Sequence, residues 1–326
     1  MSREIFEQRH QPQWEALEQS LSRLEGGTLV QAVPDFPELY RQICHHLALV
    51  RHRRYGADLE LRLNRLVLRG HQQLYRKSGG GLAPLLAFAR SGFPRLVREE
   101  KRLVAAAALL FALPLFLMTF LVPRYPELAL AVLSPASIEE MGEQYAPSGS
   151  LQAGRPVDSD VLMFGYYIRN NISIAFRTFA GGILGGVGSI FFLVYNGLVI
   201  GAVMGHIRQM GYGGRFFPFV IGHGAFELTA IVLAGAAGLR MGLALLSPGR
   251  LSRGQALVTA GRTSIRILYG AAVMLVFAAF LEAFWSPMTQ PAATKYGVGI
   301  ILWGYVFSYF LLAGRGRAGS AGMRRP

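Results

Sequence analysis

The stretch that most constrains the fold runs from Phe164 to Gly242, where glycines recur in a mostly apolar background. Glycine inside a soluble helix costs about 1 kcal/mol relative to alanine, whereas in a bilayer it lets helix backbones approach closely. Glycines four residues apart share one helical face. The sets with this spacing are Gly181/Gly185, Gly182/Gly186, Gly197/Gly201/Gly205 and Gly238/Gly242. The pattern therefore predicts closely packed membrane helices, with helix packing as the role of these glycines.

The composition and the grouping of apolar residues agree with a membrane protein. The chain has 326 residues, of which 52% are hydrophobic, and a formal net charge of +14. Apolar windows of about 18 residues or more are typical of spanning helices. The windows are Leu103–Val122, Ile172–Tyr195, Leu198–Met210, Phe219–Leu246, Ile267–Trp285 and Val298–Ala313. We expect an all-α polytopic membrane protein with about six membrane segments, although Leu198–Met210 and Val298–Ala313 are short.

The first 102 residues differ from the rest in being polar and rich in charge. Apolar residues recur at helical spacing from Phe6 to Leu24, from Leu39 to Val50 and from Leu59 to Tyr75, and a fourth helix is expected from Pro84. Residues 1–102 are therefore predicted to be a cytosolic bundle of about four helices. The polar start of the chain indicates no cleaved secretory signal, and the single Cys44 suits a reducing compartment.

The distribution of arginine predicts the orientation of the chain in the cytoplasmic membrane. The N-terminal part, the link Pro248–Arg266 and the tail 315–326 are arginine-rich, whereas residues 123–161 are acidic and interrupted by proline and glycine. Positively charged segments stay on the cytosolic side. We expect both termini and the basic tail in the cytosol. The transmembrane domain is then 103–314, with residues 123–161 as a largely irregular exported loop.

Two arrangements of the middle segments remain open at this stage. In the first, Asn196-Gly197 is a turn and Ile172–Tyr195 and Leu198–Met210 cross separately. In the second, Ile172–Met210 crosses once and Phe219–Leu246 forms a re-entrant hairpin, which is tolerated only when protein buries it. Residues 164–168 are expected to lie as a helix at the exported interface before the chain turns inward.

A few polar residues stand inside the apolar segments and are the candidates for function. His223 and Glu227 are four apart, so on a helix they share a face and could form a hydrogen-bonded pair or bind one metal ion together. A structural pair is the favoured interpretation, followed by a substrate or proton pathway. A metal site is the weakest, because no further metal ligand is evident nearby. We therefore predict no metal and no cofactor.

Glu282 is the other conspicuous acid, with Arg177 and His206 as candidate partners and a position near the exported surface as the alternative. Asn170, Asn171 and Asn196 are expected to serve as caps, turn formers or interhelical hydrogen bonders. Protease, esterase, kinase and phosphate-loop motifs are absent from the sequence, so we expect a protein that is not an enzyme. Membrane orientation explains the basic charge better than nucleic-acid binding does.

Several of these features occur together in one family. The chain resembles the stage II sporulation protein M family of multi-pass membrane proteins on the following motifs: Tyr167-Ile168-Arg169-Asn170-Asn171, the glycine run after Phe179, Asn196-Gly197, His223-Gly224-x-x-Glu227 and Leu281-Glu282-Ala283-Phe284. The resemblance implies an integral membrane protein whose sporulation members act with cell-wall-degrading partners, as an anchor and not as the hydrolase.

Two functions from different classes follow from these observations. The first is a membrane scaffold that recruits protein partners through the cytosolic domain and the exported loop, in contact with membrane lipid and with homo-oligomerisation left open. The second is a permease or channel subunit that works with a separate cytosolic ATPase. Its support is the embedded polar residues and the link from Arg250 to Arg266, which has the pattern of a helix lying on the cytosolic face.

Overall fold

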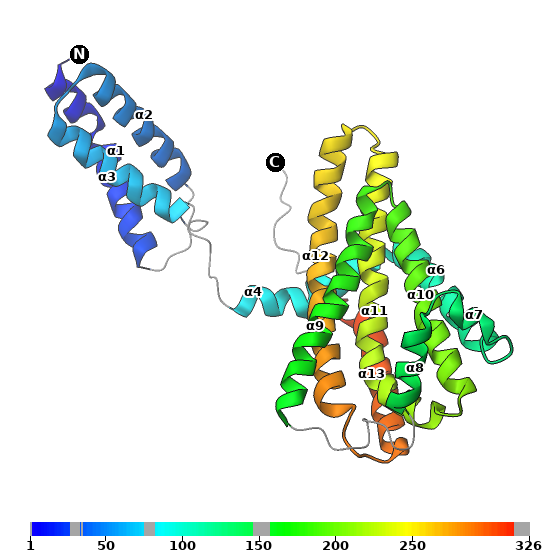
Figure 1. Cartoon of the computed structure of the whole chain (residues 1–326). Coiled ribbons are helices and arrows are strands. Elements are labelled where there is room, and N and C mark those ends of the chain that lie inside the picture. The colour runs from blue at the N-terminus through cyan, green and yellow to red at the C-terminus, as the bar shows by residue number, and fades with distance from the viewer. Residues whose placement is uncertain (1, 27–32, 34, 75–81, 146–156, 316–326) are drawn as a thin grey trace. The chain divides into compact units, whose positions relative to one another are not determined.

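The computed structural model describes residues 2–26, 33, 35–74, 82–145 and 157–315, and the structure is 87% helical with no strand among these residues. The all-α prediction is therefore confirmed. The chain divides into two compact units, Met1–Pro84 and Leu85–Pro326 (Figure 1).

Three antiparallel helices form the N-terminal unit: α1 (Arg3–Glu25), α2 (Phe36–Arg53) and α3 (Ala57–Leu74). Their buried faces follow the helical spacing of the apolar residues, which places Trp14, Ile43 and Leu63 in one core. A two-bond ion pair between Arg69 of α3 and Glu25 of α1 joins two of the helices at the surface, with both distances 2.9 Å. This guanidinium lowers the pKa of the Glu25 carboxyl.

The core of this unit contains a histidine, His46, whose side chain is buried. The indole Nε1–H of Trp14 donates a hydrogen bond to His46 Nδ1 at 3.2 Å, which requires an unprotonated Nδ1. Burial, followed by the proximity of His10 and His45, lowers the pKa of His46 to about 4. Protonation of the imidazole therefore opposes the folded state of this unit.

We expect the stability of the N-terminal unit to fall as the pH is lowered from about 6.5 to about 4. In this window the unfolded chain, with an ordinary histidine pKa, binds a proton that the folded unit does not bind. The free energy of unfolding therefore falls as the pH is lowered. Amide hydrogen exchange of α1 and α2 in the full chain, corrected for intrinsic rates, measures the change between pH 7 and pH 5. His46→Gln should lose less stability over the same interval, and equal losses would contradict the assignment.

The second unit is built from six long helices: α6 (Lys101–Leu121), α9 (Val157–Ala180), α10 (Val187–Gln209), α11 (Gly213–Leu246), α12 (Arg253–Phe280), which continues as the π-helical turn η4 (Leu281–Trp285), and α13 (Ala292–Leu312). In the described part of the chain, α6, α10, α11, α12 with η4, and α13 are long and apolar enough to cross a membrane. α11 contacts each of the other long helices and is the central element of the unit (Figure 1). The prediction of an all-α polytopic membrane protein is confirmed.

Both predicted arrangements of the middle segments are wrong. Asn196-Gly197 lies inside α10, where the Asn196 amide donates to the Phe192 carbonyl at 2.6 Å. The turn occurs earlier, through η3 (Gly181–Ile183) and two glycines with left-handed backbone, Gly185 and Gly186. Glycine adopts such angles without strain. The turn precedes α10, so Leu198–Gln209 is the second half of a 23-residue helix and Met210 is its C-cap. Phe219–Leu246 is likewise part of one continuous helix, α11, and not a hairpin.

Three further predictions about local structure are corrected. Residues 164–168 lie within the uninterrupted helix α9 and precede no change of direction there. The link from Arg250 to Arg266 is not a separate surface helix, because α12 begins at Arg253 behind a capping box of Ser252 and Gln255 and continues into the bundle. The short window Val298–Ala313 is extended by the start of α13 at Ala292, which gives a helix of 21 residues.

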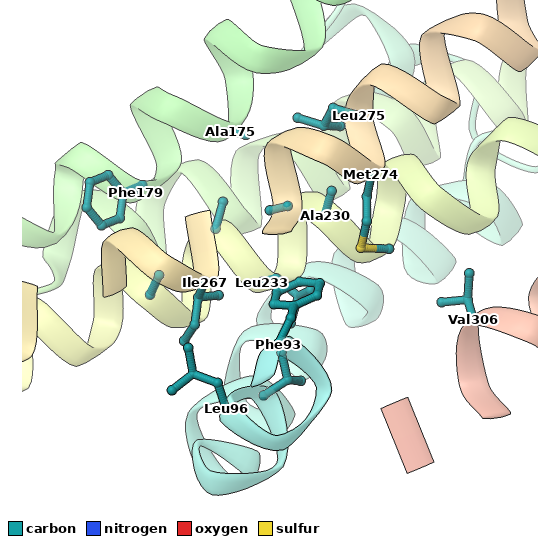
Figure 2. Packing of buried hydrophobic residues seen from close by; sticks show 14 of the residues in the cluster. Phe93, Leu96, Ala175, Phe179, Ala230, Leu233, Ile267, Met274, Leu275 and Val306 are labelled. Carbon is teal, nitrogen blue, oxygen red and sulfur yellow. The ribbon is translucent and has the colours of Figure 1, made fainter. Parts of the chain in front are cut away.

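The fourth helix expected in the N-terminal domain belongs to the second unit from Leu85 onward. It consists of α4 (Leu82–Ala87), a π-helical segment η2 (Phe88–Gly92) and α5 (Phe93–Glu99). Phe93 packs directly on the backbone of Gly270 in α12, and Figure 2 shows Phe93 and Leu96 beside Ile267 and Leu233 in the main core. The compact units therefore divide at residues 84 and 85, before the 102 boundary expected from composition.

The segment expected to be irregular contains two short helices in its described part, α7 (Glu127–Leu130) and α8 (Pro135–Tyr145). Ala129 and Leu133 pack against α6 and α10, and the Tyr145 ring meets Phe216 of α11 edge to face at 5.2 Å. Arg215 donates to the Tyr145 carbonyl at 3.3 Å. These contacts hold α7 and α8 against α6, α10 and α11.

Candidate functional site

Three ionisable side chains from two helices meet in the second unit. His223 and Glu227 project from one face of α11, as their spacing predicts, and Glu282 comes from η4 at the end of α12. One ligand atom from each residue lies within 4.8 Å of the others. The His223 side chain is buried and the two carboxylates are half-buried. We refer to His223, Glu227 and Glu282 as the polar cluster.

The histidine of the polar cluster is held in place by residues that the sequence did not single out. His223 Nδ1 and Ser286 Oγ are 3.1 Å apart, within hydrogen-bond distance. The backbone carbonyl of Ser286 accepts a hydrogen bond from Lys295 Nζ at 2.7 Å. The Phe219 ring packs edge-on against the imidazole, with centroids 5.5 Å apart. Ser286 therefore fixes the imidazole through Nδ1, and Nε2 is the remaining ring nitrogen.

The π-helical turn explains how α12 presents its residues to α11. Within η4 the Ser286 amide donates to the Leu281 carbonyl at 2.7 Å, five residues back, so the turn is wider than an α-helical one. Glu282 and Ser286 both face His223 of α11, the first through the polar cluster and the second through its contact with Nδ1. A side chain at Gly222 would come within 3.1 Å of the Trp285 ring, so glycine lets η4 approach α11. π-bulges of this kind are frequent at functional sites.

The asparagines named from the sequence do not belong to the polar cluster. Asn170 donates to the Asn171 side chain at 3.0 Å, and Asn171 is buried with no hydrogen bond at Nδ2 within the described chain. Tyr167, one turn earlier on α9, packs against Ala279 and Ala283 beside Glu282. Asn196 bonds only its own helix in the described contacts.

Neither candidate partner of Glu282 is part of the polar cluster. Arg177 turns back to Ser173 on its own helix, with a side-chain contact of 3.0 Å. His206 lies on α10 and is not among the three clustered ligands. The partners that the structure brings to Glu282 are instead His223 and Glu227, which lie more than 50 residues away in the chain.

The glycines of α10 face the backbone of α6. A Cβ at Gly197 or Gly201 would collide with the carbonyl oxygen of Phe111 or Leu115, and one at Gly205 would lie 2.8 Å from the Met118 carbonyl oxygen. The sets Gly181/Gly185 and Gly182/Gly186 differ from expectation, because these four glycines lie in a turn and not along a helix, whereas Gly238/Gly242 lies along α11 as predicted. That turn nevertheless packs closely on α11: Gly182 meets Gly238 and Gly186 meets Gly242.

An ion pair lies where α6 begins and α11 ends. Arg240 of α11 and Glu100, immediately before α6, form a short hydrogen-bonded pair whose side chains are 28% and 15% exposed. The pair lines a pocket of about 650 Å³ together with residues of α12. In the sequence, Glu100 stands in a run of charges of both signs from Arg98 to Arg102. Nothing in this run indicates Arg240, 140 positions away, as its partner.

The fold and the polar cluster define a class: an all-α multi-pass membrane protein with an embedded histidine and two carboxylates. The model of the family described as stage II sporulation protein M matches residues 106–287, more than half of the chain. The chain therefore belongs to the stage II sporulation protein M family, as its motifs predict. The matched region contains all three residues of the polar cluster.

A second model, described as a domain of unknown function, matches residues 4–76. This match coincides with α1 to α3 of the N-terminal unit. No curated protein and no solved structure matches the chain.

We expect His223 and Glu227 to behave as one unit in stability measurements. Removing either side chain leaves the other buried with fewer polar contacts, at a cost of about 1–3 kcal/mol. His223→Ala and Glu227→Ala should each destabilise the protein, and the double variant should cost clearly less than the sum. Chemical unfolding in detergent measures the cycle. Strict additivity would assign the two residues to separate partners.

Proposed function

We propose that this family member is a non-enzymatic membrane scaffold or anchor that recruits partner proteins in cell-envelope remodelling. The observation that carries the proposal is the set of glycine contacts in which helix backbones touch directly. Gly197 and Gly201 bring the backbone of α10 into contact with the backbone of α6. Gly182 and Gly238 do the same for the η3 turn and α11. Backbones in such contact cannot slide past each other without a clash, which suits a rigid anchor better than a moving carrier.

A scaffold needs surfaces for partners outside the bilayer, and the N-terminal unit and α8 each supply a candidate. In the N-terminal unit, Leu61 and Leu68 are 57% and 54% exposed and lie two turns apart on α3, with exposed Arg65 between them. Exposed apolar side chains grouped with arginine are typical of protein-binding surfaces. The second candidate is α8, where Ala136, Glu139 and Glu140 are exposed.

Crosslinking in the native membrane tests the scaffold proposal. A photoreactive amino acid at Arg65 should capture a defined partner, identified by mass spectrometry. Leu61→Ser/Leu68→Ser should abolish that crosslink while the protein level stays normal. Ile5→Ser, which removes an exposed apolar side chain from α1, is the matched control and should leave the crosslink unchanged. A crosslink pattern unaffected by the α3 changes would count against this surface.

The proposed orientation places both termini in the cytosol and residues 123–161 outside, in the cytoplasmic membrane. Its support is the arginine distribution. In a chain with Cys44 replaced by serine, Ala136→Cys in α8 should react with an impermeant thiol reagent in intact cells, and Gln11→Cys in α1 should not. Ser148, an equivalent position for the probe, lies outside the described residues. Labelling at Gln11→Cys alone would reverse the orientation.

A permease or channel subunit is the second candidate, favoured by the polar cluster inside the apolar unit. The other support, a separate helix on the cytosolic face, is lost because α12 is continuous. Replacing His223, Glu227 and Glu282 by near-isosteric neutral residues separates the two functions. A scaffold should lose stability or assembly, whereas a permease should remain assembled and lose solute flux.

A further inference from the structure

The polar cluster has the composition of a metal-ligand set. It combines one imidazole and two carboxylates, contributed by α11 and by η4 of α12. Zn²⁺ is bound in proteins by histidine nitrogen and by carboxylate oxygen, and a set of three protein ligands leaves one position open for an exchangeable ligand. We propose that His223, Glu227 and Glu282 bind one divalent transition-metal cation of the Zn²⁺ type.

The spacing of the donor atoms is compatible with a single ion after a small adjustment. The three atoms lie within 4.8 Å of one another. Around a tetrahedral ion with bonds of about 2.0–2.2 Å, donor atoms are about 3.4 Å apart. The imidazole is held by Ser286, whereas the two carboxylate groups end flexible side chains. Rotation of the Glu227 and Glu282 side chains toward His223 would therefore shorten the separations between donor atoms to those around a single ion.

Charge balance gives a second reason for a cation. Metal coordination uses carboxylates in their ionised form, and two negative charges without a counter-charge are costly in apolar surroundings. A divalent cation neutralises both, while the imidazole coordinates in its neutral form. The nearby ammonium of Lys295 supplies one positive charge, and it donates to the Ser286 carbonyl. A metal ion balances the two carboxylates fully.

The surroundings of His223 resemble those of a metal-binding histidine. Such histidines usually engage their second ring nitrogen in a hydrogen bond, which fixes the ring and its tautomer. Here Ser286 Oγ engages Nδ1 at 3.1 Å, so Nε2 is the ring nitrogen that would coordinate the ion. Ser286 itself is positioned by the π-helical turn and by Lys295. The ligand set is thus supported by residues that orient it.

Metal analysis of the full chain tests the inference. Protein purified in detergent without an affinity tag is stripped with a chelator, dialysed against Zn²⁺ and analysed for metal content. We expect about one Zn²⁺ per chain, and with Co²⁺ a visible absorption band that chelator abolishes. His223→Gln and Glu282→Gln should weaken binding by at least tenfold, and Ser286→Ala by about 10–100-fold.

Two matched variants serve as controls. His206→Gln removes another histidine of the membrane unit, and Glu143→Gln removes an exposed carboxylate from α8. Both should bind metal like the unmodified protein. Size-exclusion elution and helical circular dichroism establish that each variant is folded. The chelator-reversible Co²⁺ band is measured on the unmodified protein, so this test of metal binding does not depend on the folding of any variant. The inference is overturned if the unmodified protein binds neither Zn²⁺ nor Co²⁺, or if the cluster variants bind as well as the controls.

Discussion

Replacing Gly201 by leucine is expected to lower the melting temperature of the detergent-solubilised protein by about 10 °C or to prevent folding of the membrane unit. A Cβ at this position would collide with the Leu115 carbonyl oxygen and lie 2.9 Å from the Leu115 Cα. Overpacking typically costs about 1–3 kcal/mol when side chains can move aside. Here the obstacle is helix backbone, so the cost should reach or exceed the upper end of that range.

Gly304→Leu on α13 is the matched control for this substitution. Gly304 is also a membrane-helix glycine, but it is exposed and nothing lies within 4 Å of a Cβ built there. The melting temperature of this variant should stay within about 2 °C of the unmodified protein. Because the ridge of Gly197, Gly201 and Gly205 faces α6 of the same chain, the expected effect of Gly201→Leu is on stability. Equal melting temperatures for the two variants would remove the ridge as a source of stability.

The second large effect is expected for Glu100→Gln, with a loss of about 3 kcal/mol in the free energy of unfolding. The substitution leaves the Arg240 guanidinium without its charged partner, although Arg240 is only 28% exposed. A partly buried unpaired charge costs far more than the loss of a surface pair. Arg240→Gln should destabilise comparably, and the double variant should cost clearly less than the sum of the two.

The neighbouring Glu99 provides the control. Glu99 Oε1 lies 3.7 Å from Arg95 Nε, and the side chains of Glu99 and Arg95 are 60% and 62% exposed. Glu99→Gln removes the same charge one residue away and should cost about 0.5 kcal/mol or less. Denaturant unfolding in one detergent compares all four variants. Similar losses for Glu99→Gln and Glu100→Gln would show that the Arg240 contact adds no stability.

The structural differences from expectation arise where local preference and tertiary packing disagree. Asn196-Gly197 has the composition of a turn, yet Gly197 is needed for close contact with α6, and the helix continues through it. The actual turn uses Gly185 and Gly186, whose four-residue spacing from Gly181 and Gly182 imitates a helical packing face. A glycine repeat alone therefore does not distinguish a helix face from a turn that packs against one.

The N-terminal boundary differs for a related reason. Residues 85–102 end in a charged run like those of the first unit, so composition alone assigns them to it. Several of their apolar side chains, including Phe93 and Leu96, nevertheless pack in the core of the second unit (Figure 2). Composition averages over a segment, whereas membership of a core depends on which side chains find a complementary surface, such as Gly270 for Phe93.

The helical class, the polytopic membrane character, the family and the placement of His223 and Glu227 on one helical face can all be predicted from the sequence. These properties depend on hydropathy, on residue order and on the 3.6-residue period, all of which act over short distances along the chain. Three contacts emerge only when the helices pack: Glu282 joins the pair, Ser286 holds the imidazole, and Arg240 contacts Glu100. Those contacts connect residues 55 to 140 positions apart, and helix packing selects them through backbone clearances that no local pattern encodes.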